Sequence, residues 1–254
     1  MANNWQEDEL LLTLHLYHRT SFGKLHKTNP EIIKLANIIG RSPSAVAMKA
    51  CNFASLDPAL SQKGLTGASN ADKALWNEFT ENSVEIAEKA ERLFEERVEG
   101  VAAPKNEINE PKIKYDQTES VRETKVRLVQ TFFRRAILIN YNYRCAISGL
   151  AIPELLVASH IIPWSVSESR RADPTNGIAL NALYDKAFDR CLISFDENFQ
   201  LMLSEKIKSQ SENKLIQEYF LKLEGKELEM PSKSYPDKKA FETHRQNMCV
   251  ATEC

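Results

Sequence analysis

Apolar residues recur at helical spacing near the start of the chain. One stripe, at i, i+1, i+4 and i+7, consists of Leu10, Leu11, Leu14 and Tyr17. A second helix is predicted from Asn29-Pro30-Glu31, which supplies an N-cap residue, a proline in the first turn and an acid beside it. Gly40 is expected to end this helix.

A third helix start follows at Ser42-Pro43-Ser44, with Val46, Ala50 and Phe53 on one face. Three short helices joined by tight turns are typical of a helix-turn-helix or Myb-like DNA-binding bundle. The same pattern suits a three-helix protein-interaction module, and the spacing does not separate the two.

Residues 71–98 have the charge and apolar spacing of one long helix. The next stretch carries Pro104 and Pro111 among Lys, Asn and Glu, a composition typical of a linker. We therefore expect a helical module at 1–100, a linker at 101–117 and a second domain at 118–254.

The second domain mixes helix and strand signals. A helix is predicted at 121–140, and a short helix at 183–190. Strands are predicted within 141–149, 155–162, 191–195 and 199–203, the last two flanking an Asp-Glu-Asn turn. The whole chain is therefore expected to be α+β.

Bulk composition narrows the class of protein. With 254 residues, 43% hydrophobic and 27% charged, the chain is expected to fold as a globular protein rather than remain disordered. No segment approaches the roughly 18 consecutive apolar residues of a membrane span, and the first residues lack a signal-peptide pattern. We expect a cytoplasmic protein with no membrane partner.

The five cysteines are scattered and form no C-x-x-C pair. This spacing argues against a disulfide framework and against a structural zinc site, so neither is expected.

Net charge carries little information about partners, because the formal value is only −2. One basic run stands out between residues 121 and 144. Its members are Arg122, Lys125, Arg127, Arg134, Arg135 and Arg144, with the single acid Glu123. Such a run is either a solvated helix face or a surface that contacts phosphate.

Residues 158–196 carry the candidate chemistry. His160 ends an apolar strand, Asn176-Gly177 forms a turn, and Asp185 and Asp189 then fall at i, i+4 on one helix face. Hydrolysis of a phosphodiester needs a base for water and a cation to neutralise developing charge. One imidazole beside two carboxylates can supply both, and carboxylates suit a hard ion such as Mg²⁺ or Mn²⁺.

Residues 130–205 resemble the His-Asn-His (HNH) endonucleases, which have a ββα-metal fold, and in particular bacterial restriction-type members. The matching motifs, in chain order, are R-C-A-I-S-G, S-H-I-I-P-W, D-P-x-N-G-I-x-L, an aromatic-A-F-D helix and L-I-S-F-D. The resemblance implies a C-terminal HNH nuclease domain that needs a divalent metal.

The family pattern assigns roles to two of these residues. His160 matches the general base that deprotonates water, and Asn176 matches the residue that braces the loop between strand and helix. The third motif position is Tyr184, a poor metal ligand because its phenol titrates near 10. We therefore assign the metal to Asp185 and Asp189, which is an inference of our own and not a motif match. Ser159 is a further departure from the family pattern, because many relatives have an aspartate ligand there.

The resemblance implies an endonuclease that cuts double-stranded DNA, with a restriction or defence role, and cutting of both strands by one site favours a homodimer. The N-terminal segment is similar to leader regions found before such domains in bacteria. Arg41, Ser44 and Lys49 are expected near the start and on the exposed face of its recognition helix. The expected DNA contacts are Arg41, Ser44, Lys49, Arg134, Arg135 and Arg144.

Other interpretations stay open at this stage. The chain could be a DNA-binding or regulatory protein with an inactive HNH fold, or a nuclease specific for RNA or DNA structures. Individually, His160 could be an ordinary hydrogen-bonded histidine, and Asp189 could cap a turn. His244 is expected at the surface, or in contact with phosphate, and Trp164 is expected to anchor a loop.

Overall fold

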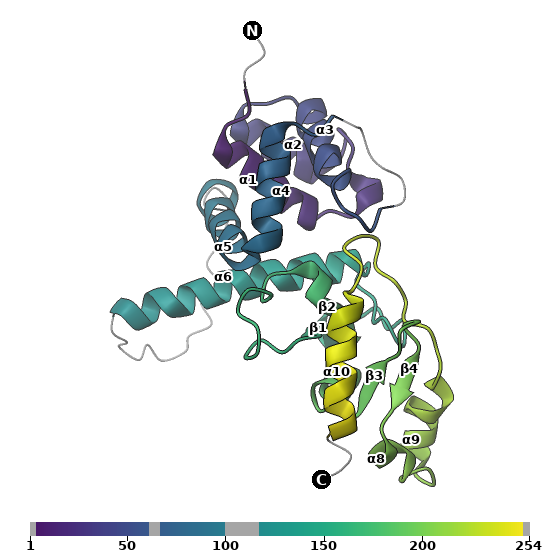
Figure 1. The fold of residues 1–254 in the computed structure, drawn as a ribbon. Coiled ribbons are helices and arrows are strands. Elements are labelled where there is room, and N and C mark those ends of the chain that lie inside the picture. Colours follow the sequence, from purple (N-terminus) through teal and green to yellow (C-terminus); the bar gives the residue numbers. More distant parts are fainter. Residues whose placement is uncertain (1–3, 61–66, 100–116, 251–254) are drawn as a thin grey trace. The chain divides into compact units, whose positions relative to one another are not determined.

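The computed structural model describes residues 4–60, 67–99 and 117–250 of the chain (Figure 1). The chain divides into two units, Met1–Arg135 and Ala136–Cys254. The predicted linker, 101–117, lies outside the described residues except for Gln117. The predicted domain limits therefore stay a prediction.

The described part of the first unit is helical. Its elements are α1 (Glu7–His18), a 3-10 turn (Phe22–Lys24), α2 (Pro30–Ile39), α3 (Pro43–Ala54), α4 (Asn70–Glu81), α5 (Ser83–Phe94), a π-helical turn (Glu95–Glu99) and the first part of α6 (Gln117–Asn140).

Helices α2 and α3 begin where a side chain can bond the free amides of the first turn. The Asn29 side chain accepts from the Glu31 amide, and the Ser42 hydroxyl accepts from the Ala45 amide. Gly40 adopts the left-handed conformation, φ 69°, that ends α2. These starts and this end confirm the predictions from the sequence.

The core of the first unit lies between the apolar faces of α1, α2, α3 and α5. All four residues of the predicted α1 stripe are buried, as are the three predicted on α3. Buried side chains from these helices meet in one cluster: Leu12, Leu16, Ile32, Leu35, Ala36, Val46, Ala47 and Phe94. The apolar spacing of α1 to α3 therefore predicted which faces are buried.

The predicted single helix over 71–98 is wrong. Asn82 leaves the helical conformation, with φ −129° and ψ 52°, and separates α4 from α5. The amide of Asn82 bonds the Glu78 carbonyl, and the backbone turns there before α5 starts at Ser83. Asparagine favours such ends because its side chain competes with helical backbone bonds.

The second unit contains two small antiparallel sheets and several helices. Its strands are β1 (Leu156–His160), β2 (Gly177–Asn181), β3 (Ile193–Phe195) and β4 (Leu201–Leu203). Its helices after α6 are α7 (Ala182–Asp189), α8 (Glu205–Lys208), α9 (Lys214–Tyr219) and α10 (Lys238–Val250). Three 3-10 turns lie at Pro153–Leu155, Pro174–Asn176 and Leu221–Leu223. The chain is α+β, as the sequence predicted.

Helix α7 packs against both β1 and β2, which places a ββα unit at the centre of the second unit. Strands β1 and β2 pair with His160 opposite Gly177. Figure 1 shows α10 running beside β3, and the two are in contact. Phe188, Phe195 and Phe241 join α7, β3 and α10 through ring contacts.

The predicted strand within 141–149 is wrong, because this segment forms two turns. Asn142 and Tyr143 have φ of 51° and 54°, and the Tyr143 amide bonds the Leu138 carbonyl to close the end of α6. Ala146 then bonds Ala179 of β2 by one hydrogen bond. Tyr141, Cys145, Ala146 and Ile147 are buried although the segment is a loop, so burial alone does not require a strand.

Among the described residues, no helix combines the length and apolar character required to cross a membrane.

Candidate functional site

The end of β1 and the exposed side of α7 form one pocket of about 530 Å³. The polar residues that line it are Ser159, His160, Ser165, Asp185, Lys186, Asp189 and Arg190. The ββα packing therefore brings together the histidine and both carboxylates that the sequence singled out.

His160 is oriented by a backbone carbonyl. Its Nε2 lies 3.0 Å from the Arg171 oxygen. Because a carbonyl can only accept, Nε2 carries the proton, and in the neutral ring the basic lone pair is on Nδ1. Burial lowers the pKa of His160, although the Arg171 carbonyl and the Asp189 carboxylate oppose this effect. The imidazole is therefore largely neutral at pH 7 and can accept a proton.

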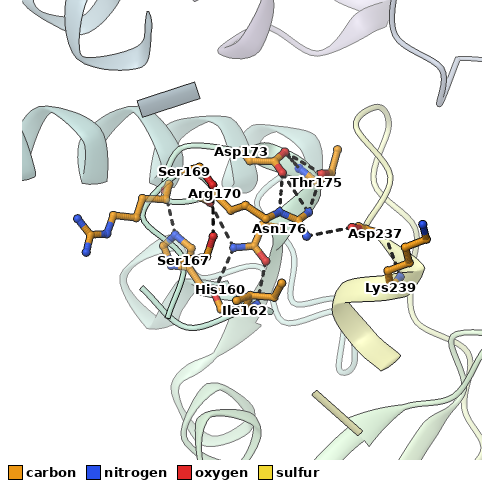
Figure 2. Close-up of polar contacts among 11 residues, drawn as sticks. His160, Ile162, Ser167, Ser169, Arg170, Asp173, Thr175, Asn176, Asp237 and Lys239 are labelled. Carbon is orange, nitrogen blue, oxygen red and sulfur yellow. Dashed lines mark hydrogen bonds and ion pairs between the residues drawn. The ribbon is translucent and has the colours of Figure 1, made fainter. Parts of the chain in front are cut away.

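Asn176 braces the connection between β1 and β2 from inside. Its side chain is 1% exposed. Its Oδ1 accepts from the Ile162 amide at 2.8 Å, and its Nδ2 donates to the Ile162 carbonyl at 3.1 Å and the Arg170 carbonyl at 3.2 Å. Figure 2 shows these bonds beside His160. This geometry is the one that the predicted bracing role requires.

Trp164 anchors the same connection and forms part of the pocket wall. Its carbonyl accepts from Arg171 Nε at 3.0 Å, and the Arg171 guanidinium lies 4.7 Å from its ring centroid. The ring also meets the His160 imidazole edge to face, at 5.7 Å between centroids. Trp164 thus restricts the movement of the imidazole on one side.

Asp185 and Asp189 lie one turn apart on α7. Asp189 is exposed and Asp185 is half-buried. Burial is the main cause that raises the pKa of Asp185; the Ser159 hydroxyl opposes it, and the Asp189 carboxylate raises the pKa further. The Asp189 carboxylate disfavours the charged form of Asp185, and a cation bound beside both would favour it.

The protein ligands available for a cation are few. Among residues 4–60, 67–99 and 117–250, no three histidine, cysteine, aspartate or glutamate side chains come together as a metal-binding group. Asp185 and Asp189 fit a hard divalent ion that keeps water and phosphate oxygens in its other positions, as Mg²⁺ commonly does.

Tyr184 does not face the pocket. Its side chain is 2% exposed, its hydroxyl donates to the Tyr219 carbonyl at 2.9 Å, and its ring meets Phe220. Burial raises its pKa to about 12. Tyr184 therefore stabilises the packing of α7 on the segment around α9, and it presents no ligand to a metal beside His160.

Two of the predicted DNA contacts on the first unit form internal ion pairs. Arg41 donates to Glu9 at 2.6 Å and lies over Trp5. Lys49 is 7% exposed and bonds the buried Asp72 at 2.7 Å, so its predicted place on an exposed face is wrong. Its charge is needed inside because Asp72 is fully buried. Ser44 is exposed at the start of α3, as predicted.

The three arginines of the basic run that were predicted to contact DNA lie in different surroundings. Arg134 is exposed. Arg135 bonds the fully buried Glu91 at 2.5 Å and thus has a structural partner in the first unit. Arg144 is exposed in the second unit and donates to the Gly149 carbonyl at 3.4 Å. None of these positions tests whether the residues bind DNA.

His244 is neither at the surface nor free to contact phosphate, so both expectations for it are wrong. It is 5% exposed and stacks on Phe188 with 3.8 Å between ring centroids. Nε2 lies 3.0 Å from the Phe188 carbonyl, and Nδ1 lies 2.9 Å from the Ser194 hydroxyl. Burial lowers its pKa to about 4, so it is a neutral core residue.

The sequence interpretation missed the residues that surround the His160 loop. Arg171 supplies the carbonyl for His160, and Arg170 bonds both Asp173 and Asp237. The turn chemistry of Asp173-Pro174-Thr175 was visible as a signal. Asp237 gave no signal, because its partner lies 67 residues earlier in the chain.

Comparison with known proteins agrees with this site. Residues 145–196 match the family model of the HNH endonucleases. The match covers about a fifth of the chain and includes His160, Asn176, Asp185 and Asp189. No curated protein matches the sequence.

Proposed function

We propose that the chain is a metal-dependent DNA endonuclease. The premise is that residues 145–196 match the HNH endonucleases. The observation that carries the proposal is the bond between His160 Nε2 and the Arg171 carbonyl. It sets the tautomer of a neutral imidazole in a pocket that also contains two carboxylates.

His160 acts as the general base in this proposal. Nδ1 removes a proton from water as the water oxygen forms a bond to phosphorus, and the bond to the leaving oxygen of the sugar breaks. A base that is neutral at the working pH is required for this step, and burial keeps His160 neutral. Asn176 and Trp164 contribute by restricting the loop and the ring.

Asp185 and Asp189 would hold one divalent cation, Mg²⁺ or Mn²⁺. The bound ion would neutralise negative charge that develops on the phosphate and on the leaving oxygen. Lys186 and Arg190 also line the pocket and carry positive charge. In the proposal, the negative charges of Asp185 and Asp189 offset these and attract the cation.

Double-stranded DNA is the proposed substrate, and the first unit is its proposed docking module. Ser44 is exposed in the first turn of α3, where its hydroxyl can bond phosphate. Arg134 and Arg144 are exposed and can contribute sequence-independent attraction. Arg41 and Lys49 would bind DNA only by exchanging their present acidic partners. A restriction or host-defence role in the cytoplasm completes the proposal.

One observation favours a second function, a DNA-binding or regulatory protein with an inactive HNH fold. Tyr184 occupies the position of the third motif residue and is buried, with its hydroxyl bonded to a carbonyl. The metal site then depends on two carboxylates alone. A nuclease specific for RNA or for particular DNA structures shares the site of the first proposal, and differs only in substrate.

The test is cleavage of plasmid and modified phage DNA by the full chain with Mg²⁺, Mn²⁺ or EDTA. His160→Ala is expected to lower the cleavage rate at least about 100-fold, as expected for a lost general base. His26→Ala, at an exposed histidine of the first unit, is the matched control and should cut like the wild type.

Metal-dependent cutting that disappears in His160→Ala would support the nuclease. DNA binding without cutting under any metal would favour the inactive fold, and preference for RNA would change the substrate. Equal cutting by His160→Ala and wild type would reject the role of His160.

A further inference from the structure

The loop of residues 161–176, between β1 and β2, folds back on the strand that it follows. Its Arg171 carbonyl accepts from His160 Nε2, and its Ile161 amide bonds the Asn176 carbonyl. The orientation of the His160 ring thus depends on the position of the Arg171 carbonyl. That position depends in turn on the contacts that hold the loop near Arg171.

Arg170, the residue before that carbonyl, is held through its side chain at three points. Nε donates to Asp173 Oδ2 at 3.0 Å, one terminal nitrogen donates to Asp237 Oδ2 at 2.9 Å, and the other donates to Thr175 Oγ1 at 3.2 Å. The side chain is only 22% exposed, so these bonds are partly shielded from water.

Asp237 belongs to a different part of the second unit and is itself anchored. Its amide donates to the Thr175 carbonyl at 2.9 Å. Its Oδ1 accepts from the Lys239 amide at 2.9 Å, at the start of α10. Figure 2 shows the dashed line from Arg170 to Asp237, which joins the loop to the segment that leads into α10.

The backbone of Arg170 is also held. Its carbonyl accepts from Asn176 Nδ2 at 3.2 Å. Main chain and side chain are thus fixed on opposite sides of one residue, and the next carbonyl along the chain is the one that bonds His160. The peptide between residues 170 and 171 is thus held by its carbonyl, and it directly precedes the peptide that carries the Arg171 carbonyl.

We infer that Arg170, anchored by Asp237, is a positioning residue for His160. It holds the Arg171 carbonyl opposite Nε2, and so it selects the ring tautomer with the proton on Nε2 and the lone pair on Nδ1. The effect of Arg170 on catalysis rests on the proposed function, whereas the tautomer of His160 is a property of the folded chain and can be measured without activity.

The chemistry requires arginine at this position. A planar guanidinium presents donors on several sides and reaches Asp173, Asp237 and Thr175 at once. Lysine retains the charge, but its single ammonium cannot match all three acceptors. Arg170→Lys therefore separates the geometry of the contacts from the charge.

The experiment measures the tautomer by ¹⁵N NMR of the histidine side chains in the full, metal-free chain at pH 8. At this pH the rings are neutral, so the shifts report which nitrogen carries the proton. His160→Gln assigns the signals. The wild type is expected to show His160 with the proton on Nε2, and Arg170→Lys is expected to show a mixture of both tautomers.

Asp237→Asn is the second variant. Its amide oxygen keeps the acceptor for the Lys239 amide, so α10 keeps its start, while the negative charge toward Arg170 is lost. It should shift the tautomer in the same direction as Arg170→Lys, and the double variant should shift it no further than Arg170→Lys alone, because both changes act on the contact between residues 170 and 237. Arg92→Lys, at an exposed ion pair of α5, is the control.

In an active preparation, both variants should lower kcat by about 10- to 100-fold with little change in KM, since the base is displaced and the substrate contacts remain. An unchanged His160 tautomer in folded Arg170→Lys and Asp237→Asn would overturn the inference. A shifted tautomer in a chain whose wild type cuts no nucleic acid would uphold the positioning role and reject the proposed function.

Discussion

His160 is half-buried and His244 is buried, and their hydrogen bonds also differ. His160 bonds a carbonyl through Nε2 and lines a pocket. His244 has both nitrogens bonded inside the core, to Phe188 and Ser194. At the residue scale, the core histidine is therefore held neutral, whereas the site histidine lies at a pocket, as the proposed role of a base requires.

The first residue-scale prediction concerns acid stability. The pKa of His244 is about 4 in the folded chain, below the value near 6.5 of an unfolded histidine. The unfolded state therefore binds more protons between these values, and stability is complete above about pH 6.5 and falls toward pH 4. His244 should account for about 3 kcal/mol of this loss.

His244→Gln is the matched variant, because its amide can donate to the Phe188 carbonyl and accept from Ser194 without titrating. Urea unfolding of both proteins is measured from pH 7 to pH 4.5, and the unfolding transition whose midpoint the variant changes at pH 7 is followed. The difference in midpoint between wild type and His244→Gln should become smaller as the pH falls. Parallel pH profiles would contradict the neutral core histidine.

A second prediction at this scale concerns the two carboxylates of α7. Asp185→Asn and Asp189→Asn should each raise the Mg²⁺ concentration for half-maximal cleavage by about tenfold or more, because each removes a charged ligand. Glu197→Gln, at an exposed acid of the β3–β4 turn, is the charge-matched control. If all three variants required the same Mg²⁺ concentration, the metal assignment would be rejected.

At the scale of elements, helix starts and ends depend on short-range bonds. The Asn29 side chain accepts from Glu31 at 2.9 Å and also donates to the Lys24 carbonyl at 2.8 Å. The Ser42 hydroxyl makes one cap bond, at 3.2 Å, and is exposed. The Asn29 side chain therefore makes two hydrogen bonds and links α2 to the preceding turn, whereas the Ser42 side chain makes only the cap bond among the described residues.

This difference predicts that Asn29→Ala destabilises the first unit by about 1–2 kcal/mol, and Ser42→Ala by about 0.5–1 kcal/mol. Urea unfolding of the full chain, followed through its helical signal, gives the comparison. Asn29→Asp keeps the cap acceptor and should fall between wild type and Asn29→Ala. A greater loss for Ser42→Ala than for Asn29→Ala would show that the Lys24 contact contributes nothing.

At the scale of the whole molecule, the proposed duplex substrate and the pocket around His160 lead to a prediction about assembly. In the proposed mechanism one such site would cut one strand at a time, so two chains are expected to act on a duplex. Sedimentation of the full chain with a duplex of about 30 base pairs should show two chains per DNA. Cleavage of both strands in one encounter by a strictly monomeric complex would contradict the dimer.

Prediction from sequence succeeded where the signal is local. The starts of α2 and α3, the end at Gly40, the β3–β4 hairpin and the helix that carries Asp185 and Asp189 all followed from caps, turns and spacing. The resemblance also pointed to His160 and Asn176; His160 lines the pocket and Asn176 bonds the loop that follows β1, while their roles stay predictions.

Prediction failed where burial could be satisfied in more than one way. The apolar segment 141–149 packs as turns, because the end of α6 needs two left-handed residues there. The break at Asn82 falls in a polar stretch whose spacing suits a continuous helix. In both cases the packing of neighbouring elements outweighs local propensity.

The sequence by itself determined where α2 and α3 begin, which faces α1 and α3 bury and which residue types surround the candidate site, since these depend on contacts within a few residues. Only the tertiary structure decided that Lys49 and Tyr184 are structural and that Arg170 meets Asp237. Each of these contacts joins residues far apart in the chain. Such pairs meet because of the path that the backbone takes between them, and no local periodicity of the sequence specifies that path.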